Sequence, residues 1–127
     1  MRLASLHNLM EAKEELIRGI GKPFSQVTPR DVYYFCLDYG KVRWRRGEEI
    51  IKRSPAYAYA YARDILRGRF PEAENAMSKD TEVAFNYAIH FVGERWPEGE
   101  EAIKKSKALW GEYLNAFDIE TEEDIFV

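Results

Sequence analysis

Apolar residues recur along this chain with the spacing of an amphipathic helix. In residues 28–53 they stand at Val32, Phe35, Cys36 and Tyr39, the i, i+3, i+4, i+7 pattern of one helical face. The pattern returns three more times, as Ala58, Tyr61, Ala62 and Ile65; as Ala84, Tyr87, Ala88 and Phe91; and as Trp110, Tyr113, Leu114 and Phe117. Successive sets are related by a constant 26-residue step. The pattern therefore predicts four long helices in a tandem repeat.

The starts of these helices are marked at the same interval. The residues before them all carry side chains that accept hydrogen bonds from free helix N–H groups: Thr28, Ser54, Asp80 and Ser106. In residues 56–62 alanine and tyrosine alternate, which a half-buried strand would also show. Alanine favours helix and the three equivalent segments do not alternate, so we expect helix there.

A shorter helix is predicted after each of the first three long ones, over 45–52, 71–78 and 97–104. Its apolar stripe has a small residue at its centre, Gly47, Ala73 or Gly99, which would let a neighbouring helix approach closely. A pair of helices cannot bury its own stripe, but stacked pairs can. The sequence thus predicts an all-α fold, a short α-helical solenoid of about four 26-residue helix-turn-helix repeats.

We expect one domain over 1–127. Residues 1–27 would form an N-terminal capping helix, over 3–18, and a linker; 28–105 would form three repeats; and 106–127 would form a truncated repeat with an acidic C-terminal tail. The chain has 127 residues, of which 46% are hydrophobic, so it can form a buried core. Its net charge of −3 argues against a strongly basic nucleic-acid binder. One cysteine excludes an internal disulfide. With no long apolar run and no signal sequence, we expect a soluble cytoplasmic protein.

Residues 57–74 and 95–100 resemble a short tandem repeat of bacteriophage and prophage proteins, in which YAxxVIxGRWPEAE is followed by xxIxKDPxxAYxYA. The similarity covers roughly 28–106 and is loosest in the first unit, where Arg45 and Arg46 replace Pro-Glu. It implies a phage origin, a helical-repeat fold and the host bacterial cytoplasm. It implies no catalytic residue.

The sequence predicts no catalytic, metal or cofactor site, so we expect no enzyme. His90 has no second histidine at i+4 and is interpreted as a surface or inter-repeat polar contact. Cys36 occupies a core position and is interpreted as a small buried residue. Gly68 is placed to end the second long helix in a left-handed conformation.

Two sets of charged residues are candidates for binding. One set consists of arginines and glutamates that recur in each unit, namely Arg43, Arg69 and Arg95 with Glu48, Glu74 and Glu100. They either bridge within the stack or form a ladder for an acidic partner, and the structural interpretation is favoured.

The net charge decreases along the chain. It is +4, +1 and −1 over residues 41–53, 67–79 and 93–105 (six basic minus two acidic residues, three minus two, and three minus four). The basic first unit suggests nucleic-acid contact through a cluster of cations around Trp44, namely Lys41, Arg43, Arg45, Arg46, Lys52 and Arg53. A solvated face with Trp44 buried is the favoured alternative.

Aromatic side chains beside the core stripe are a second candidate surface, because tyrosine is common at interface hot spots. An inter-repeat packing seam explains them equally well. These residues are Tyr33, Tyr34, Tyr57, Tyr59 and Phe85.

The leading hypothesis is a phage-encoded, non-enzymatic protein that engages a host protein or complex and inhibits or redirects it. The alternatives are a nucleic-acid-associated protein that uses the basic first unit, and a self-associating structural phage component. No cofactor, small-molecule substrate or membrane partner is expected.

Overall fold

A computed structural model describes residues 16–120 of the chain, and this part is all-helical. It has no named strand, only an isolated bridge between Leu16 and Pro23. The elements, in chain order, are η1 (Phe24–Gln26), α2 (Pro29–Asp38), α3 (Arg45–Ile51), α4 (Pro55–Tyr61), η2 (Ala62–Leu66), η3 (Pro71–Ala73), α5 (Glu74–Met77), α6 (Thr81–Tyr87), η4 (Ala88–Val92), α7 (Pro97–Ile103) and α8 (Lys107–Ala116).

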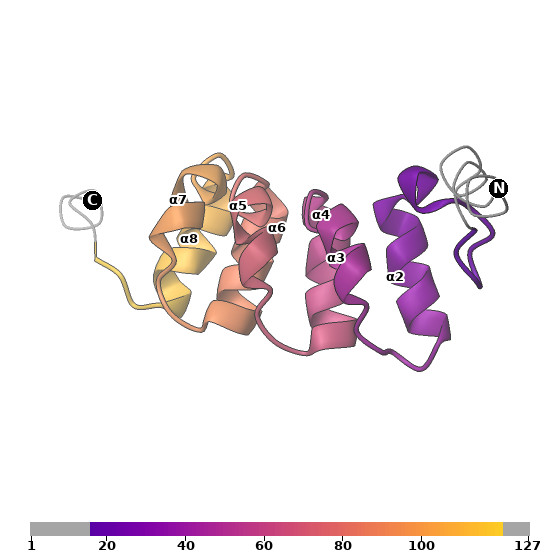
Figure 1. Cartoon of the computed structure of the whole chain (residues 1–127). Coiled ribbons are helices and arrows are strands. Elements are labelled where there is room, and N and C mark those ends of the chain that lie inside the picture. The colour runs from indigo at the N-terminus through magenta and orange to yellow at the C-terminus, as the bar shows by residue number, and fades with distance from the viewer. Residues whose placement is uncertain (1–15, 121–127) are drawn as a thin grey trace, which may run out of the picture.

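Long and short helices alternate, and they stand side by side in a row from the N-terminal to the C-terminal end (Figure 1). The π-helical turns η2 and η4 continue α4 and α6, and the 3₁₀ turn η3 leads into α5. The alternating segment 56–62 is helical, as predicted. Most of the helix predicted over 3–18 lies outside the described residues, and residues 16–18 are not helical.

All four predicted N-caps are confirmed. The side chains of Thr28, Ser54, Asp80 and Ser106 each accept a hydrogen bond from the backbone N–H three residues later. At Thr28 the bond is reciprocal, because the Asp31 carboxylate accepts from the Thr28 N–H. Each cap satisfies one of the free donors at a helix start, so the sequence sets where the long helices begin.

The core lies between the long and the short helices. Its largest fully buried side chains are Tyr61, Tyr87, Tyr113, Phe70, Ile51, Met77, Ile103, Val32 and Cys36. These residues belong to the apolar stripes recognised in the sequence. Three of them are tyrosines, whose hydroxyl groups require hydrogen-bond partners when they are buried.

Each of these hydroxyl groups lies in a cluster with an arginine, a glutamate and one backbone N–H group. Arg43 donates two hydrogen bonds to the Glu48 carboxylate, at 2.6 and 2.9 Å. The Tyr61 hydroxyl donates to Glu48 Oε2 at 2.8 Å and accepts from the Trp44 N–H at 3.0 Å. Tyr61 belongs to the next helical pair along the chain, so this tyrosine joins one pair to the next.

The same cluster recurs at the equivalent positions of the next two units. Arg69 and Arg95 donate two bonds each to Glu74 and Glu100. The Tyr87 and Tyr113 hydroxyls donate to these carboxylates, at 2.6 and 2.7 Å, and accept from the N–H groups of Phe70 and Trp96. The structural interpretation of the repeated arginines and glutamates is thus confirmed.

Electrostatics keep this cluster in one protonation state. Burial and the adjacent carboxylate raise the pKa of Tyr61, Tyr87 and Tyr113, so each phenol stays protonated and can donate. Burial also raises the pKa of Glu74 and Glu100, but hydrogen bonds from arginine and tyrosine outweigh it, and the net pKa lies below the usual glutamate value. The carboxylates therefore remain charged acceptors.

In the first unit, where no Arg–Glu pair precedes it, the equivalent of these tyrosines is a phenylalanine, Phe35. It occupies, in the first unit, the position that Tyr61 holds in the second. No Arg–Glu pair precedes it at the equivalent positions, which hold Ile17 and Lys22. A tyrosine hydroxyl at this half-buried position would therefore find no equivalent Arg–Glu pair to bond with.

The size of the aromatic residue before each short helix is matched by the size of the small residue within that helix. A Cβ added at Gly47 would lie 2.4 Å from Trp44 Cε3, and one at Gly99 would lie 2.6 Å from Trp96 Cε3. In the middle unit the aromatic residue is the smaller Phe70, and the equivalent of these glycines is Ala73. Tryptophan therefore occurs with glycine, and phenylalanine with alanine, which keeps the packed volume nearly constant.

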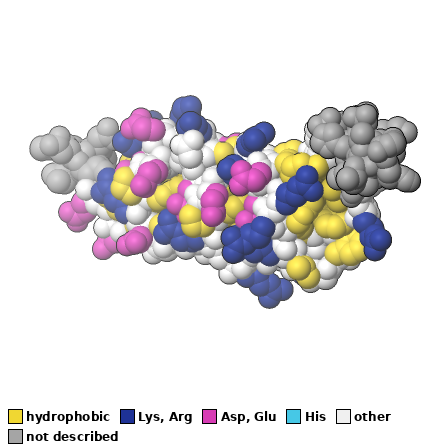
Figure 2. Space-filling view, in the orientation of Figure 1, with side chains coloured by type: hydrophobic (Ala, Val, Ile, Leu, Met, Phe, Trp, Pro, Cys, Tyr) yellow, Lys and Arg dark blue, Asp and Glu magenta, His cyan; other side chains and the backbone are white. Residues whose placement is uncertain are grey.

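Charge is distributed unevenly along the row. On the face in Figure 2, Asp and Glu side chains lie over the middle and the C-terminal part, Lys and Arg side chains lie along the whole row, and hydrophobic side chains gather near α2. This agrees with the decrease from +4 to −1 across the three sequence windows.

Gly99→Ala should lower the free energy of unfolding by about 1–2 kcal/mol, because the new methyl group clashes with Trp96 and overpacking exceeds the helix-propensity gain. Adding Trp96→Phe, which recreates the Phe70–Ala73 combination, should recover part of this loss. Urea denaturation measures both. Gly111→Ala is the control: nothing lies within 4 Å of its Cβ position, so it should stabilise α8. A neutral Gly99→Ala would contradict the volume argument.

Tyr87→Phe should cost about 1–3 kcal/mol, because it leaves the buried Phe70 N–H without an acceptor and removes a donor from Glu74. Tyr34→Phe, on an exposed ring, should change stability by less than about 0.5 kcal/mol. Thermal and chemical denaturation of the two variants make the comparison. Equal effects would mean that the cluster does not hold the helical pairs together.

Candidate functional site

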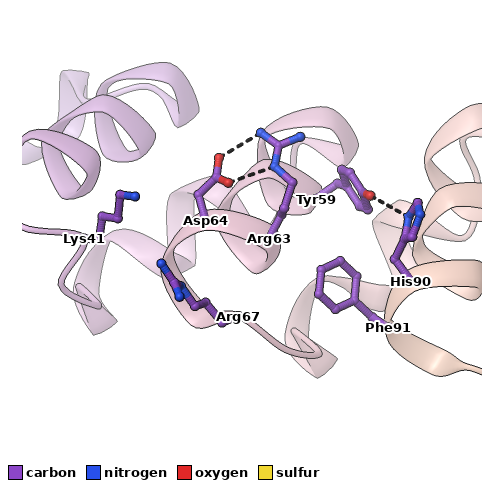
Figure 3. Close-up of a pocket in the computed structure, with 7 residues that line it drawn as sticks. All are labelled: Lys41, Tyr59, Arg63, Asp64, Arg67, His90 and Phe91. Carbon is purple, nitrogen blue, oxygen red and sulfur yellow. Dashed lines mark hydrogen bonds and ion pairs between the residues drawn. The ribbon is translucent and has the colours of Figure 1, made fainter.

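A groove opens between the second and third long helices (Figure 3). Its volume is about 500 Å³. Four lining residues lie on α4 and η2 or directly after η2, two lie on η4, and one lies in the loop after α2. They are Tyr59, Arg63, Asp64 and Arg67; His90 and Phe91; and Lys41. The groove thus has three basic side chains, a histidine and two aromatic rings around one carboxylate.

The ends of the long helices position two of these cations. Lys41, Arg67 and Gly93 stand at the same position of successive units, and their N–H groups donate to the carbonyls of Cys36, Ala62 and Ala88. All three have left-handed backbones, with φ of 60°, 55° and 73°. The left-handed residue that ends η2 is therefore Arg67 and not Gly68, contrary to the prediction, because the π-helical turn moves the helix end. For a residue other than glycine this conformation costs about 1 kcal/mol or more.

Asp64 is fully engaged by its neighbours. Arg63 Nε and Nη2 each donate to it at 2.8 Å, and the Tyr33 hydroxyl donates from the preceding long helix at 2.5 Å. The Arg63 hydrogen bonds outweigh burial and lower the pKa of Asp64 to about 2. One unit later Tyr59 and His90 repeat the Tyr33–Asp64 contact, with 3.1 Å between the hydroxyl and Nδ1. This supports the interpretation of His90 as a polar contact between units.

The side chains of Arg67 and Lys41 differ from that of Arg63, because neither forms a hydrogen bond or ion pair with another residue of 16–120. Both are exposed. The Lys41 charge nevertheless helps to lower the pKa of Asp64. The groove accordingly presents two available cations beside the Tyr59 and Phe91 rings, whose centroids lie 5.8 Å apart.

The aromatic residues predicted to lie on the surface are placed differently from one another. Tyr33 is buried, with 9% of its surface exposed, which agrees with the packing-seam alternative and not with a surface role: its hydroxyl is bound to Asp64 and its ring packs against Tyr57. Tyr57, Tyr59 and Phe85 are half-buried in the seams between long helices, and Tyr34 is exposed. Only Tyr59 lines the groove.

Three basic residues of the first unit are engaged by other side chains of the chain. Arg43 binds Glu48, Lys52 pairs with Glu49, and the Arg46 guanidinium lies 3.9 Å from the centroid of the Phe24 ring. Arg45 is exposed on α3, and Lys41 turns to the groove.

Trp44 is half-buried, and its ring packs against two phenylalanine rings. The distance between ring centroids is 6.1 Å to Phe24 and 5.0 Å to Phe35. The expectation that it lies in the core is met only in part. Its equivalents Phe70 and Trp96 are buried. The residues around it leave little of a stacking platform for bases.

Sequence reasoning missed Arg63, Arg67 and Phe91 as members of one site. A signal was present, because Lys41 and Arg67 lie at the same position of successive 26-residue units. Their convergence with residues of the third unit depends on how the long helices stack, which the repeat alone does not show.

Burial raises the pKa of the Cys36 thiol to about 11, so it is a poor nucleophile at neutral pH. Within residues 16–120, no group of three or more His, Cys, Asp and Glu could hold a metal ion. No helix of this part is long and apolar enough to cross a membrane.

Comparison with protein-family models, with curated proteins and with solved structures found no match.

Asp64→Asn should destabilise the protein by about 2 kcal/mol at neutral pH, because it removes the charge that Arg63 and Tyr33 hold. The folded-state pKa of Asp64, about 2, lies below the usual aspartate value of about 3.9. Its stabilisation is thus present above pH 3.9 and lost as pH falls toward 2. Urea denaturation from pH 6 to 2 should show the difference between wild type and variant shrinking over this window. A constant difference would contradict the proposed role of the charge.

Proposed function

We propose that the chain is a short α-helical solenoid of 26-residue units and acts as a non-enzymatic binding protein. One observation carries this proposal. The Arg–Glu–Tyr bonds between successive helical pairs recur at each 26-residue step, whereas outward positions of the long helices and of the turns that end them differ. Two differing sets are Tyr34, Ala60 and Asn86, and Lys41, Arg67 and Gly93.

Constant contacts maintain the stack, and varied positions are free to recognise a partner. Repeat scaffolds commonly use their extended faces in this way, because each unit contacts only its neighbours. The long helices present exposed aromatic and charged side chains on one side, among them Tyr34, Arg63 and Arg67. We call the side formed by the outward positions of α2, α4–η2 and α6–η4 the long-helix face.

The partner we propose is a bacterial host protein or complex, which this protein inhibits or redirects. The support for it is the resemblance of residues 57–74 and 95–100 to phage repeats, together with the aromatic and charged long-helix face. Nucleic acid is a weaker candidate, because three of the six cations in residues 41–53 are paired or stacked within the chain, namely Arg43, Lys52 and Arg46.

Affinity capture from a bacterial host lysate tests this function. We expect one stoichiometric host protein that survives nuclease treatment, as identified by mass spectrometry. Capture that disappears with nuclease would instead support the nucleic-acid alternative. A protein that captures nothing and forms large self-assemblies by light scattering would support the structural alternative.

The surface is tested with two variants that introduce the same charge. Tyr34→Glu changes an exposed residue of the long-helix face, and Asn75→Glu changes an exposed residue of the short helix α5, outside the groove. We expect Tyr34→Glu to weaken capture at least about tenfold and Asn75→Glu to change it by less than about twofold. The reverse ranking would place the binding surface elsewhere.

A further inference from the structure

We infer that the groove between α4–η2 and η4 binds an acidic segment of a partner polypeptide, with Lys41 and Arg67 holding its carboxylates. This rests on the proposed function, because it names the chemistry that the partner would present. The groove contributes the cations, and its aromatic wall contributes the apolar contact.

The backbone supports a role for these two cations beyond folding. Lys41 and Arg67 occupy the repeat position at which Gly93 stands in the third unit, and all three have positive φ. Glycine adopts this conformation without strain, whereas lysine and arginine do not. Strained residues of this kind cluster at ligand-binding sites. We therefore argue that Lys41 and Arg67 are kept for their side chains.

The charge balance of the groove favours an anionic ligand. Arg63 neutralises Asp64 through two 2.8 Å hydrogen bonds, and the Tyr33 hydroxyl satisfies the same carboxylate. The side chains of Lys41 and Arg67 have no ion-pair partner among residues 16–120, and no dashed line in Figure 3 joins either one to another lining residue. An arriving carboxylate would thus meet two unpaired cations without breaking an existing salt bridge.

The size and lining of the groove favour a segment of chain over a single ion. Its volume of about 500 Å³ is many times the roughly 30 Å³ that one water molecule occupies in the liquid. The half-buried rings of Tyr59 and Phe91 line the same space and offer contact to an apolar side chain. A segment that combines carboxylates with an apolar residue matches both features.

A polypeptide fits better than a nucleic acid. A nucleic acid presents an unbroken series of phosphates and is bound by surfaces with many cations. This groove places the Asp64 carboxylate between its cations, and the whole chain carries a net charge of −3. Carboxylates spaced along a peptide can approach Lys41 and Arg67 while avoiding Asp64.

The experiment uses a fluorescein-labelled peptide of three Glu-Glu-Phe repeats, with fluorescence anisotropy at low ionic strength as the readout. We expect Lys41→Gly with Arg67→Gly to weaken its affinity about tenfold or more. The Tm of this variant should stay at or above that of the wild type, because glycine suits the left-handed backbone. Retained Tm with lost binding separates a binding role from a structural one.

The matched control is Lys79→Ala with Lys107→Ala, which removes the same charge from two exposed positions outside the groove. It should alter affinity by less than about twofold. Equal weakening by both double variants would show that net charge alone governs binding and would overturn the proposal. So would wild-type affinity in the groove variant. Tighter binding of a labelled oligodeoxythymidine of equal charge would overturn the assignment to a polypeptide.

Capture from the host lysate separates this proposal from the proposed function. If the Lys41→Gly, Arg67→Gly variant captures the same host protein as well as the wild type does, the groove proposal fails and the function stands. If the wild type captures no host protein but the peptide results are as expected, the function fails and the groove chemistry stands.

Discussion

A buried tyrosine hydroxyl that bonds to two groups of the preceding helical pair is the interaction on which the rest of this structure depends. In each of three clusters it donates to a glutamate that an arginine already holds, and it accepts from the backbone N–H where the short helix begins. Burial keeps the phenol protonated, so its donor and acceptor roles persist together. No polar side-chain atom buried in residues 16–120 lacks a partner, and the row of helices is thereby held without an unpaired charge in its core.

Because that contact recurs unchanged, the remaining positions are free to vary in two distinct ways. In the core, a change of size at one position is matched by a change at its neighbour: the larger Trp96 faces Gly99, and the smaller Phe70 faces Ala73. The same compensation governs hydroxyl groups. Tyr33 and Tyr59 have partners on the next long helix, whereas their equivalent Phe85 faces a position that holds Ala116. At the outward positions of the long helices, residues differ between units without a matching change in a neighbour, as expected of positions that recognise a partner.

The groove combines both kinds of variation. Asp64, Arg63 and Tyr33 form a satisfied set that holds two long helices together. Lys41 and Arg67 project beside it from backbones that glycine would relax. Stability and proposed binding therefore make different demands on neighbouring residues of one helix end. The fold can meet both, because each strained residue lies at a surface turn, where local strain does not disturb the buried clusters.

Local chemistry read from the sequence determined the helices themselves. Caps such as Ser54 and Asp80 act within one turn, and apolar spacing acts within one helix, so both are legible without a structure. The equivalence of Lys41, Arg67 and Gly93 was legible too, as a 26-residue spacing. The tertiary structure alone decided that Tyr33 is buried, that Arg67 rather than Gly68 is left-handed, and that Lys41 meets His90 in one groove. These outcomes depend on how far each long helix continues through its π-helical turn and on how adjacent helices stack. Both follow from contacts between residues that lie far apart along the chain.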